Sequence, residues 1–373
     1  MYRVCVCLLP IVVLVCLALP AFALDWTMQT VDPDVGSEVY LSLALDPAYS
    51  PHLTYRTNAG LHYASFDGSA WHSEIVDSEG NTGFWTSLMF NGGNPCIAYR
   101  NVTVGDLKYA SWDGSAWQIG TVDSVGDTGQ YASLALDASG NPRIAYRDAT
   151  NGDLRYAAWD GSAWQTETVD SLGDVGAWSS LALDLDSSGN PLISYYDTSA
   201  ADLKYAAWDG SAWQIETVDS AGDTGGGVSL ILDAGGNPLI SYRDTTNNDI
   251  KFAAWDGASW QIQTVDALND LTGETSLALD PWGNPCVAYR DRTNLQLKFA
   301  RWDGSAWQTE VVDNSGDVDW HIRMKIDPYG NVYVAYNLLA NEDLKLATAQ
   351  IPEPGTLALL LLGAPALFLR RRR

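Results

Sequence analysis

Residues 133–170 read SLALDASGNPRIAYRDATNGDLRYAAWDGSAWQTETVD, and close variants of this stretch follow one another along the chain. It divides into four strand-length pieces, called A, B, C and D here, which begin at Ser133, Asn141, Leu154 and Ala163. The pieces are rich in Tyr, Trp, Val, Ile and Thr, and clusters of Gly, Asn, Asp, Pro and Ser separate them. This composition predicts short antiparallel strands joined by tight turns.

The junction between pieces C and D recurs at a nearly constant spacing. An aromatic residue followed by Asp-Gly marks it, at successive intervals of 46, 47, 49, 47 and 47 residues. The marking residues are Phe66, Trp112, Trp159, Trp208, Trp255 and Trp302. A repeat near this length with four strands per unit is typical of a β-propeller blade.

The number of blades follows from counting each kind of piece separately. A pieces begin at Ser42, Ser87, Ser133, Ser180, Ser229, Ser276 and Arg323, and C pieces at Leu61, Leu107, Leu154, Leu203, Ile250, Leu297 and Leu344. One D piece, Trp26–Asp32, precedes every A piece, whereas the last unit stops after its C piece. We therefore predict an all-β, seven-bladed β-propeller of four-stranded antiparallel blades over residues 24–350. The N-terminal strand completes the last blade, which leaves no unpaired edge.

The N-terminus has the pattern of an export signal. Residues 1–23 carry Arg3, a largely apolar run and then Ala21-Phe22-Ala23, the small-x-small pattern that precedes signal-peptide cleavage. A lipoprotein signal would use Cys16, but the preceding Val15 is bulkier than the residue usual at that place. The sequence therefore favours an ordinary signal peptide and an exported protein.

The C-terminal segment, residues 351–373, contains Pro352-Glu353-Pro354, thirteen apolar residues over 357–369, and four terminal arginines. The apolar run is short for a membrane-spanning helix, which needs about 20 residues. One interpretation is a membrane anchor held by the positive charges. The segment also closely resembles the PEP-CTERM sorting signal of Gram-negative bacteria. That resemblance implies a precursor anchored transiently in the membrane, removal of the tail by an exosortase-type protease, and delivery to the cell surface or an exopolysaccharide matrix.

Charge and cysteine content narrow the partners and the chemistry. The formal net charge is -25, and removal of both ends would take away Arg3 and the four terminal arginines. Such an acidic surface repels phosphate backbones, so we expect no nucleic-acid partner. Cys96 and Cys286 occupy the same position in blades 2 and 6, too far apart in a ring for a disulfide, and are expected to be two buried thiols.

The hairpin between pieces C and D carries most of the tryptophans. In residues 159–164, WDGSAW, the Asp-Gly pair supplies the turn, and the two indoles are expected to pack across it. The hairpin resembles the Asp-box of sialidase-like propellers in its position between the third and fourth strands. Its Asp and Gly are adjacent rather than separated by one residue, so the match is in position more than in pattern. An Asp-box is a fold element and implies no sialidase activity.

Two other recurrent polar features allow two interpretations each. Arginine ends the B piece in five blades, at Arg56, Arg100, Arg147, Arg243 and Arg290. It either forms an anion-binding ring or pairs with loop carboxylates, and its repetition favours pairing. The loops from D to A read Val-Asp-x-x-Gly-Asp in several blades, which suits either calcium or ordinary turns. Without a denser ligand pattern, we expect no resident cofactor, with calcium as the alternative.

The blades differ most just before piece A. Two positions ahead of it they carry, in order, Tyr40, Trp85, Tyr131, Trp178, Gly227, Glu274 and His321, and Trp320 stands beside the last. We expect this loop to line the mouth of the central channel, where a ligand can reach it. The candidate ligand-binding residues are therefore Tyr40, Trp85, Tyr131, Trp178, Trp320 and His321. The alternative is that these rings pack between blades and close the channel.

Three classes of function remain. Export, the sorting tail and the aromatic arc favour a non-catalytic surface protein that binds glycan or exopolysaccharide. A structural or protein-interaction propeller is the alternative. A sialidase-like glycoside hydrolase or lyase has less support, because the four His show no metal-ligand spacing and no Ser-His-Asp signature occurs. Glu274 is the one off-pattern glutamate near the channel, and we assign no catalytic residue.

Overall fold

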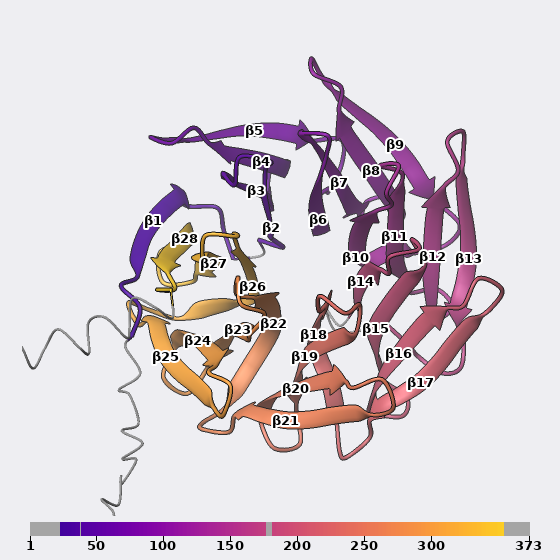
Figure 1. The fold of residues 1–373 in the computed structure, drawn as a ribbon. Coiled ribbons are helices and arrows are strands. Elements are labelled where there is room, and N and C mark those ends of the chain that lie inside the picture. The colour runs from indigo at the N-terminus through magenta and orange to yellow at the C-terminus, as the bar shows by residue number, and fades with distance from the viewer. Residues whose placement is uncertain (1–22, 38, 177–180, 354–373) are drawn as a thin grey trace, which may run out of the picture.

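A computed structural model of the protein describes residues 23–37, 39–176 and 181–353. The strands form seven four-stranded antiparallel sheets arranged as a ring, which confirms the predicted seven-bladed propeller (Figure 1). The described ranges contain no helix, and so none that is long and apolar enough to cross a membrane. The expected signal peptide, apart from Ala23, and the tail from Pro354 onward lie outside these ranges.

The first three blades follow the chain directly. Blade 1 contains β2 (Ser42–Leu45), β3 (Pro51–Thr57), β4 (Gly60–Phe66) and β5 (Trp71–Asp77). Blade 2 contains β6 (Phe84–Asn91), β7 (Asn94–Asn101), β8 (Asp106–Trp112) and β9 (Trp117–Asp123). Blade 3 contains β10 (Thr128–Leu136), β11 (Pro142–Asp148), β12 (Asp153–Trp159) and β13 (Trp164–Asp170).

The next three blades repeat this order. Blade 4 contains β14 (Leu181–Leu185), β15 (Pro191–Asp197), β16 (Asp202–Trp208) and β17 (Trp213–Asp219). Blade 5 contains β18 (Thr224–Leu232), β19 (Pro238–Asp244), β20 (Asp249–Trp255) and β21 (Trp260–Asp266). Blade 6 contains β22 (Leu271–Leu279), β23 (Pro285–Asp291), β24 (Gln296–Trp302) and β25 (Trp307–Asp313).

Blade 7 joins the two ends of the propeller, as the sequence predicts. It contains β26 (Val318–Ile326), β27 (Asn331–Leu338), β28 (Asp343–Gln350) and, as its outermost strand, β1 (Thr27–Asp32). β1 and β28 lie side by side in Figure 1, with Thr27 opposite Thr348. The Leu24 amide and the Trp26 indole both donate to the Glu310 carboxylate of blade 6, at 3.0 and 2.8 Å. The entering segment is thus fixed on two blades.

Each junction between blades contains a cluster of buried hydrophobic residues with one tyrosine from the second strand of a blade. All seven tyrosines are fully buried. Each hydroxyl donates to an aspartate at the end of the preceding blade's outermost strand, at 2.5–2.7 Å. The pairs are Tyr55–Asp32, Tyr99–Asp77, Tyr146–Asp123, Tyr195–Asp170, Tyr242–Asp219, Tyr289–Asp266 and Tyr336–Asp313. Because Asp32 belongs to β1, the same bond also closes the ring.

In three of the four Val-Asp-x-x-Gly-Asp loops, the second aspartate pairs with the arginine that ends the second strand, and in the fourth Asp223 accepts the Tyr196 hydroxyl. Arg147 lies 2.7 Å from Asp174 and Arg290 lies 2.6 Å from Asp317, and Arg100 pairs with Asp127 in the same way. Pairing with loop carboxylates is therefore confirmed for these three arginines, whereas Arg56 donates to the Asn81 side-chain amide oxygen. Within the described residues no group of three or more His, Cys, Asp or Glu is placed to hold a metal ion. The loop carboxylates engage tyrosine and arginine instead.

The hairpins between third and fourth strands are built as the sequence predicts. The Asp113 carboxylate accepts the amide N–H groups of Ser115 and Ala116 and so closes the turn. Trp112 and Trp117 meet across it edge to face, with ring centroids 5.6 Å apart. The same Trp pair recurs in blades 3 to 6, and blade 1 has Phe66 with Trp71.

A chain of serine hydroxyls links neighbouring innermost strands. The Ser42 hydroxyl accepts the Leu88 amide at 3.0 Å, and Ser87 accepts Leu134 in the same way. Ser133 accepts the amide of Leu183. Strand pairing agrees, because Ala182 takes the register position that Ser133 has in blade 3. The residue equivalent to Ser133 is therefore Ala182 and not the expected Ser180, because blade 4 carries an extra Leu-Asp.

Within the described residues, Cys96 and Cys286 are free and buried, as expected. Cys96 lies in β7 and Cys286 in β23, which belong to blades 2 and 6. Burial raises the pKa of the Cys96 thiol to about 11, so it stays protonated at neutral pH. These thiols serve as small apolar groups in the core.

Candidate functional site

The variable aromatic residues lie at the channel end of the innermost strands. We expected them in a loop, but most of them belong to the strands themselves. Trp85 belongs to β6, Tyr131 to β10 and His321 to β26, whereas Tyr40 lies two residues before the start of β2. In β6, β10 and β26 the pairing register shifts at these residues. A β-bulge re-aims side chains without ending the strand, which places these rings at the mouth of the channel.

Three of these aromatic residues have a left-handed backbone. The φ angles are 41° at Tyr40, 48° at Trp85 and 56° at Tyr131, and the corresponding Gly227 of blade 5 has 58°. Glycine adopts this conformation without steric cost, whereas a residue with a Cβ loses about 1–2 kcal/mol. Non-glycine residues held in such conformations are concentrated at functional sites.

The rings form one continuous arc. Tyr40 contacts His321 on one side, with ring centroids 4.7 Å apart, and Trp85 on the other, at 5.2 Å. Trp85 in turn contacts Tyr131 at 4.9 Å. Four of the six candidate residues are thus brought together, from blades 7, 1, 2 and 3. Part of their surface is buried by their own contacts, as the packing alternative supposed.

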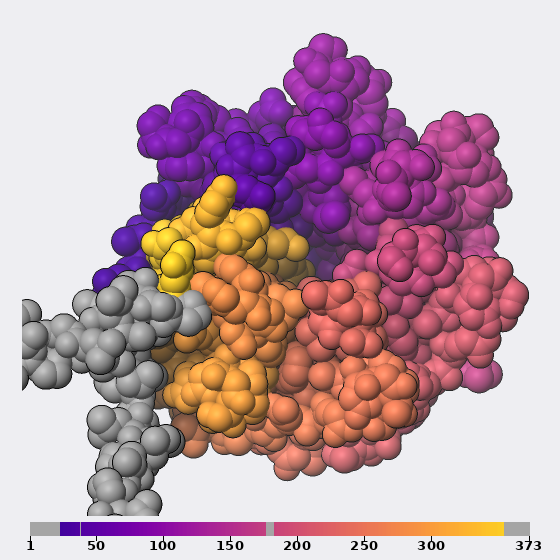
Figure 2. Space-filling model, in the orientation of Figure 1, coloured from indigo at the N-terminus to yellow at the C-terminus, as the bar shows by residue number. Residues whose placement is uncertain are grey.

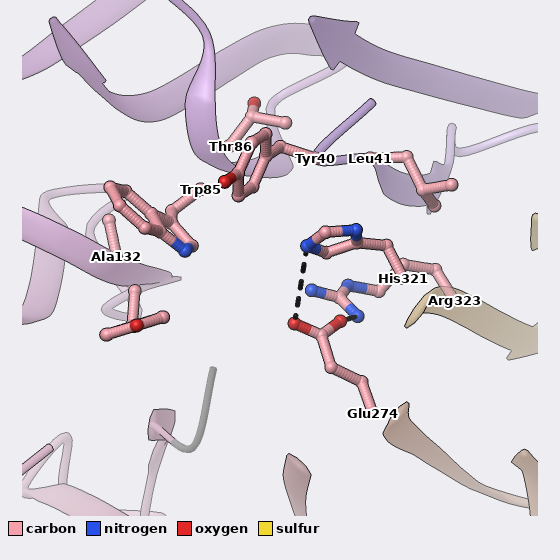
Figure 3. A pocket seen from close by; sticks show the side chains of 9 residues that line it. Tyr40, Leu41, Trp85, Thr86, Ala132, Glu274, His321 and Arg323 are labelled. Atoms are coloured by element: carbon pink, nitrogen blue, oxygen red, sulfur yellow. Dashed lines mark hydrogen bonds and ion pairs between the residues drawn. The ribbon is translucent and has the colours of Figure 1, made fainter. Parts of the chain in front are cut away.

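A charged cluster faces the arc across the channel mouth (Figure 3). The Glu274 carboxylate pairs with the Arg323 guanidinium, and its other oxygen lies 4.0 Å from Nε2 of His321. Nδ1 of His321 lies 3.3 Å from the Asp319 carboxylate. Burial alone would lower the pKa of His321, but the charges of Glu274 and Asp319 outweigh it and raise the pKa above its usual value. The imidazole is therefore more readily protonated than in water.

Of the two other candidate residues, Trp320 does not join the arc, and Trp178 cannot be compared with it. Trp320 is 49% exposed, and the Arg290 guanidinium lies over its ring at 5.8 Å. Trp178 lies outside the described residues. With the corrected register of β14, it stands four rather than two positions ahead of the residue equivalent to Ser133. Trp178 is therefore not equivalent in register to Tyr40, Trp85 and Tyr131.

The arc and the charged cluster enclose only a small cavity. Its volume is about 40 Å³, and it is lined by Tyr40, Leu41, Trp85, Thr86, Tyr131, Ala132, Glu274, His321 and Arg323. That space holds at most a few water molecules. Figure 2 shows a hollow near the centre of the ring. A ligand larger than water would have to lie across the mouth, against the rims of these rings, rather than be enclosed.

Two further charges in the innermost strands break the symmetry of the ring. Asp184 of β14 and Lys325 of β26 occupy the register position that Ala135 has in blade 3. Burial raises the pKa of Asp184 and lowers the pKa of Lys325, and attraction between the two charges opposes both shifts. Neither residue stands out in the sequence, because the two-residue shift in blade 4 hides their equivalence.

Neither protein-family models nor curated proteins match this sequence. Solved structures are similar in fold. The SapL1 lectin in complex with alpha methyl fucoside has a TM-score of 0.52 and 17% identity, over 75% of this chain and 97% of the lectin. Virginiamycin B lyase from Staphylococcus aureus has a TM-score of 0.61 and 8% sequence identity, over 88% of this chain and 100% of the lyase. The alpha-L-arabinofuranosidase Arb93A from Fusarium graminearum has a TM-score of 0.50 and 12% sequence identity, over 86% of this chain and 97% of the enzyme. At these identities the likeness shows the propeller fold alone.

Proposed function

We propose that this protein is a non-catalytic propeller that binds carbohydrate at the mouth of its channel. The observation that carries the proposal is the left-handed backbone of Tyr40, Trp85 and Tyr131. Blade 5 shows that glycine serves at this position, so three blades retain aromatic rings where the backbone disfavours them. A requirement for aromatic surface at the channel mouth explains that choice.

The chemistry of the mouth suits a sugar. Aromatic rims offer apolar surface to the C–H faces of a pyranose. Glu274 and Arg323 lie across from them and supply a carboxylate and a guanidinium for hydroxyl groups. Concave sites with a few convergent polar groups among aromatic side chains are the usual form of small-ligand sites. One lectin and one glycosidase among the structures of similar fold agree with this class of ligand but do not identify the sugar.

A binding screen tests the proposal. Residues 24–353 contain all 28 strands and every blade junction, and would be screened against glycans and bacterial exopolysaccharides. Trp85→Ala should remove binding, whereas Trp282→Ala, an exposed tryptophan in the turn between β22 and β23, should retain it. Equal binding by wild type and Trp85→Ala would refute the site. Absence of binding by the wild type would favour a structural or protein-interaction propeller instead.

A glycoside hydrolase or lyase is the second candidate, and the His321–Glu274–Asp319 cluster is the observation that favours it. A partly buried imidazole flanked by two carboxylates has the composition of a general acid–base site. The Glu274 carboxylate is instead engaged by the Arg323 guanidinium, an arrangement that suits hydrogen bonding to a ligand. Products released from a bound glycan by wild type but not by Glu274→Gln would establish catalysis.

Export and surface delivery remain part of the proposal. β28 ends at Gln350, Ile351 packs into the core of blade 7, and Pro352 and Glu353 follow directly. A protease acting on the Pro-Glu-Pro segment would therefore leave every strand intact. Expression of the full chain in a Gram-negative host with an exosortase-type protease should release a surface form that lacks the tail. Retention of the tail in that host, with Glu353→Ala behaving identically, would count against a sorting signal.

A further inference from the structure

The outer rim of the propeller contains a second departure from symmetry. In five blades, a tryptophan at or immediately before the start of the outermost strand donates its indole N–H to a residue in the preceding blade's outermost strand. These bonds are Trp117 to Glu74 at 2.9 Å, Trp213 to Glu167 at 3.1 Å, Trp260 to Glu216 at 3.0 Å, Trp307 to Gln263 at 3.1 Å and Trp26 to Glu310 at 2.8 Å. Five of the seven junctions are closed in this way.

The junction between blades 2 and 3 lacks this closure. Gly120 of β9 lies opposite Tyr109, the register position that Glu167 has opposite Tyr156 in blade 3. The Trp164 indole packs on Tyr109 at 5.5 Å as its counterparts do. Within the described residues, however, no side chain accepts the Trp164 indole N–H. The Trp164 indole therefore packs in the junction as its counterparts do, while its N–H group is available to a partner outside the protein.

A large cavity occupies this junction. Its volume is about 710 Å³, against about 40 Å³ at the channel mouth. Small-molecule sites typically measure about 300–1,000 Å³. The lining includes the rings of Tyr109, Trp112, Trp159 and Trp164, together with the polar side chains of Asn94 and Ser139. The two blades are neighbours in the ring, so both walls belong to rigid sheets (Figure 1).

The junction between blades 7 and 1 provides a comparison. Gln29 takes the glutamate position there, and the Trp71 indole N–H is buried without a partner in the described residues. A cavity of about 480 Å³ lies at that junction, but Trp71 is not part of its lining. Both junctions that lack the indole bond therefore border a cavity, and of these two the junction at Gly120 also has the Trp164 N–H donor and three indoles in its lining.

We infer that the cavity at Gly120 is a saccharide-binding site separate from the channel mouth, and that it takes a single hexopyranoside. The inference rests on carbohydrate being the class of ligand proposed above. A ring hydroxyl would accept the Trp164 indole N–H in place of the missing carboxylate. Tryptophan faces would cover the apolar face of the sugar, and the amide and hydroxyl groups at the rim would bind its other hydroxyls.

Gly120→Glu is the most informative variant. A Cβ built at Gly120 meets no atom within 4 Å, and its φ does not lie in the left-handed region, so a side chain is accommodated. The introduced carboxylate would restore the bond that five other junctions make and would occupy the part of the cavity beside the Trp164 indole N–H. The variant should melt no lower than the wild type, so a loss of binding would not reflect unfolding. The converse variant, Glu167→Gly, should open a similar cavity beside Trp213.

The experiment follows the indole N–H resonance of Trp164, assigned with Trp164→Phe, during titration with methyl glycosides. The probes are methyl α-fucoside, methyl α-galactoside and methyl α-glucoside. At least one should shift this resonance in the wild type and in Trp85→Ala, and should bind Gly120→Glu at least tenfold more weakly. No shift with any of the three, or equal binding by Gly120→Glu, overturns the inference. If polysaccharide binding were lost in Trp85→Ala but kept in Gly120→Glu, the proposed function at the channel mouth would be supported and the site at Gly120 would be refuted.

Discussion

Removal of one hydroxyl, Tyr99→Phe, should destabilise the propeller strongly although the change is small. The Tyr99 ring is fully buried, and its hydroxyl donates to Oδ2 of Asp77 at 2.6 Å. Asp77 is itself buried, 6% exposed, and its Oδ1 already accepts the Glu79 amide. The variant would leave a buried carboxylate oxygen without its donor. Hydrogen bonds to charged groups contribute about 1.5–3 kcal/mol, so we expect a loss of about 2–3 kcal/mol.

Urea unfolding followed by tryptophan fluorescence measures this loss as a shift in the transition midpoint. Tyr195→Phe is the matched control, because the Lys204 ammonium also lies 3.5 Å from the partner carboxylate of Asp170. We expect Tyr195→Phe to lose about half as much as Tyr99→Phe. A loss below about 0.5 kcal/mol in Tyr99→Phe, or equal losses in the two variants, would refute the reasoning that these bonds hold the blades together.

Three further predictions concern the hairpin aspartates, the backbone at Trp85 and the N-terminal segment. Stability should fall as the pH drops from about 4 toward 2, because hydrogen bonds in the hairpins lower the pKa of Asp113, Asp209 and Asp303 from 3.8 to about 2. Melting temperatures measured across that pH range test this, and Asp113→Asn should make the melting temperature depend less steeply on pH. Trp85→Gly should be more stable than Trp85→Ala by about 1 kcal/mol, against the usual order, because φ is positive there; thermal melts would contradict this if alanine were the more stable. Glu310→Ala should loosen the N-terminal segment by removing the acceptor of Leu24 and Trp26, which hydrogen exchange at Leu24 would report; unchanged protection would argue that packing alone holds this segment.

The repeat made most of the fold predictable from the sequence. Each of its four pieces matches a strand, and the separate counting of pieces gave both the blade number and the closure by β1. The error fell where the repeat is irregular. Blade 4 keeps the SLALD sequence but has an extra Leu-Asp after it. The pairing register is set by the turn at Asn190 rather than by the motif, so Ala182 and not Ser180 is equivalent to Ser133.

The candidate site was predictable only in part. Sequence alone placed Tyr40, Trp85, Tyr131 and His321 near one another because ring topology brings equivalent positions together. The pairing of Glu274 with Arg323 could not be read from the repeat, because it joins unlike residues of two blades. The open junction at Gly120 left a signal that a comparison of D pieces would detect. Every other D piece has Glu or Gln at that position, as Glu74 and Gln29 illustrate.

The most direct test of carbohydrate binding without catalysis is calorimetric titration of residues 24–353 with the glycan found in the screen, followed by mass spectrometry of the recovered glycan. The account predicts saturable binding, weakened at least tenfold by Trp85→Ala, and recovery of the glycan unchanged. Absence of heat with every glycan tested would contradict carbohydrate binding. Recovery of shortened or unsaturated products would contradict the non-catalytic assignment and direct attention to His321 and Glu274.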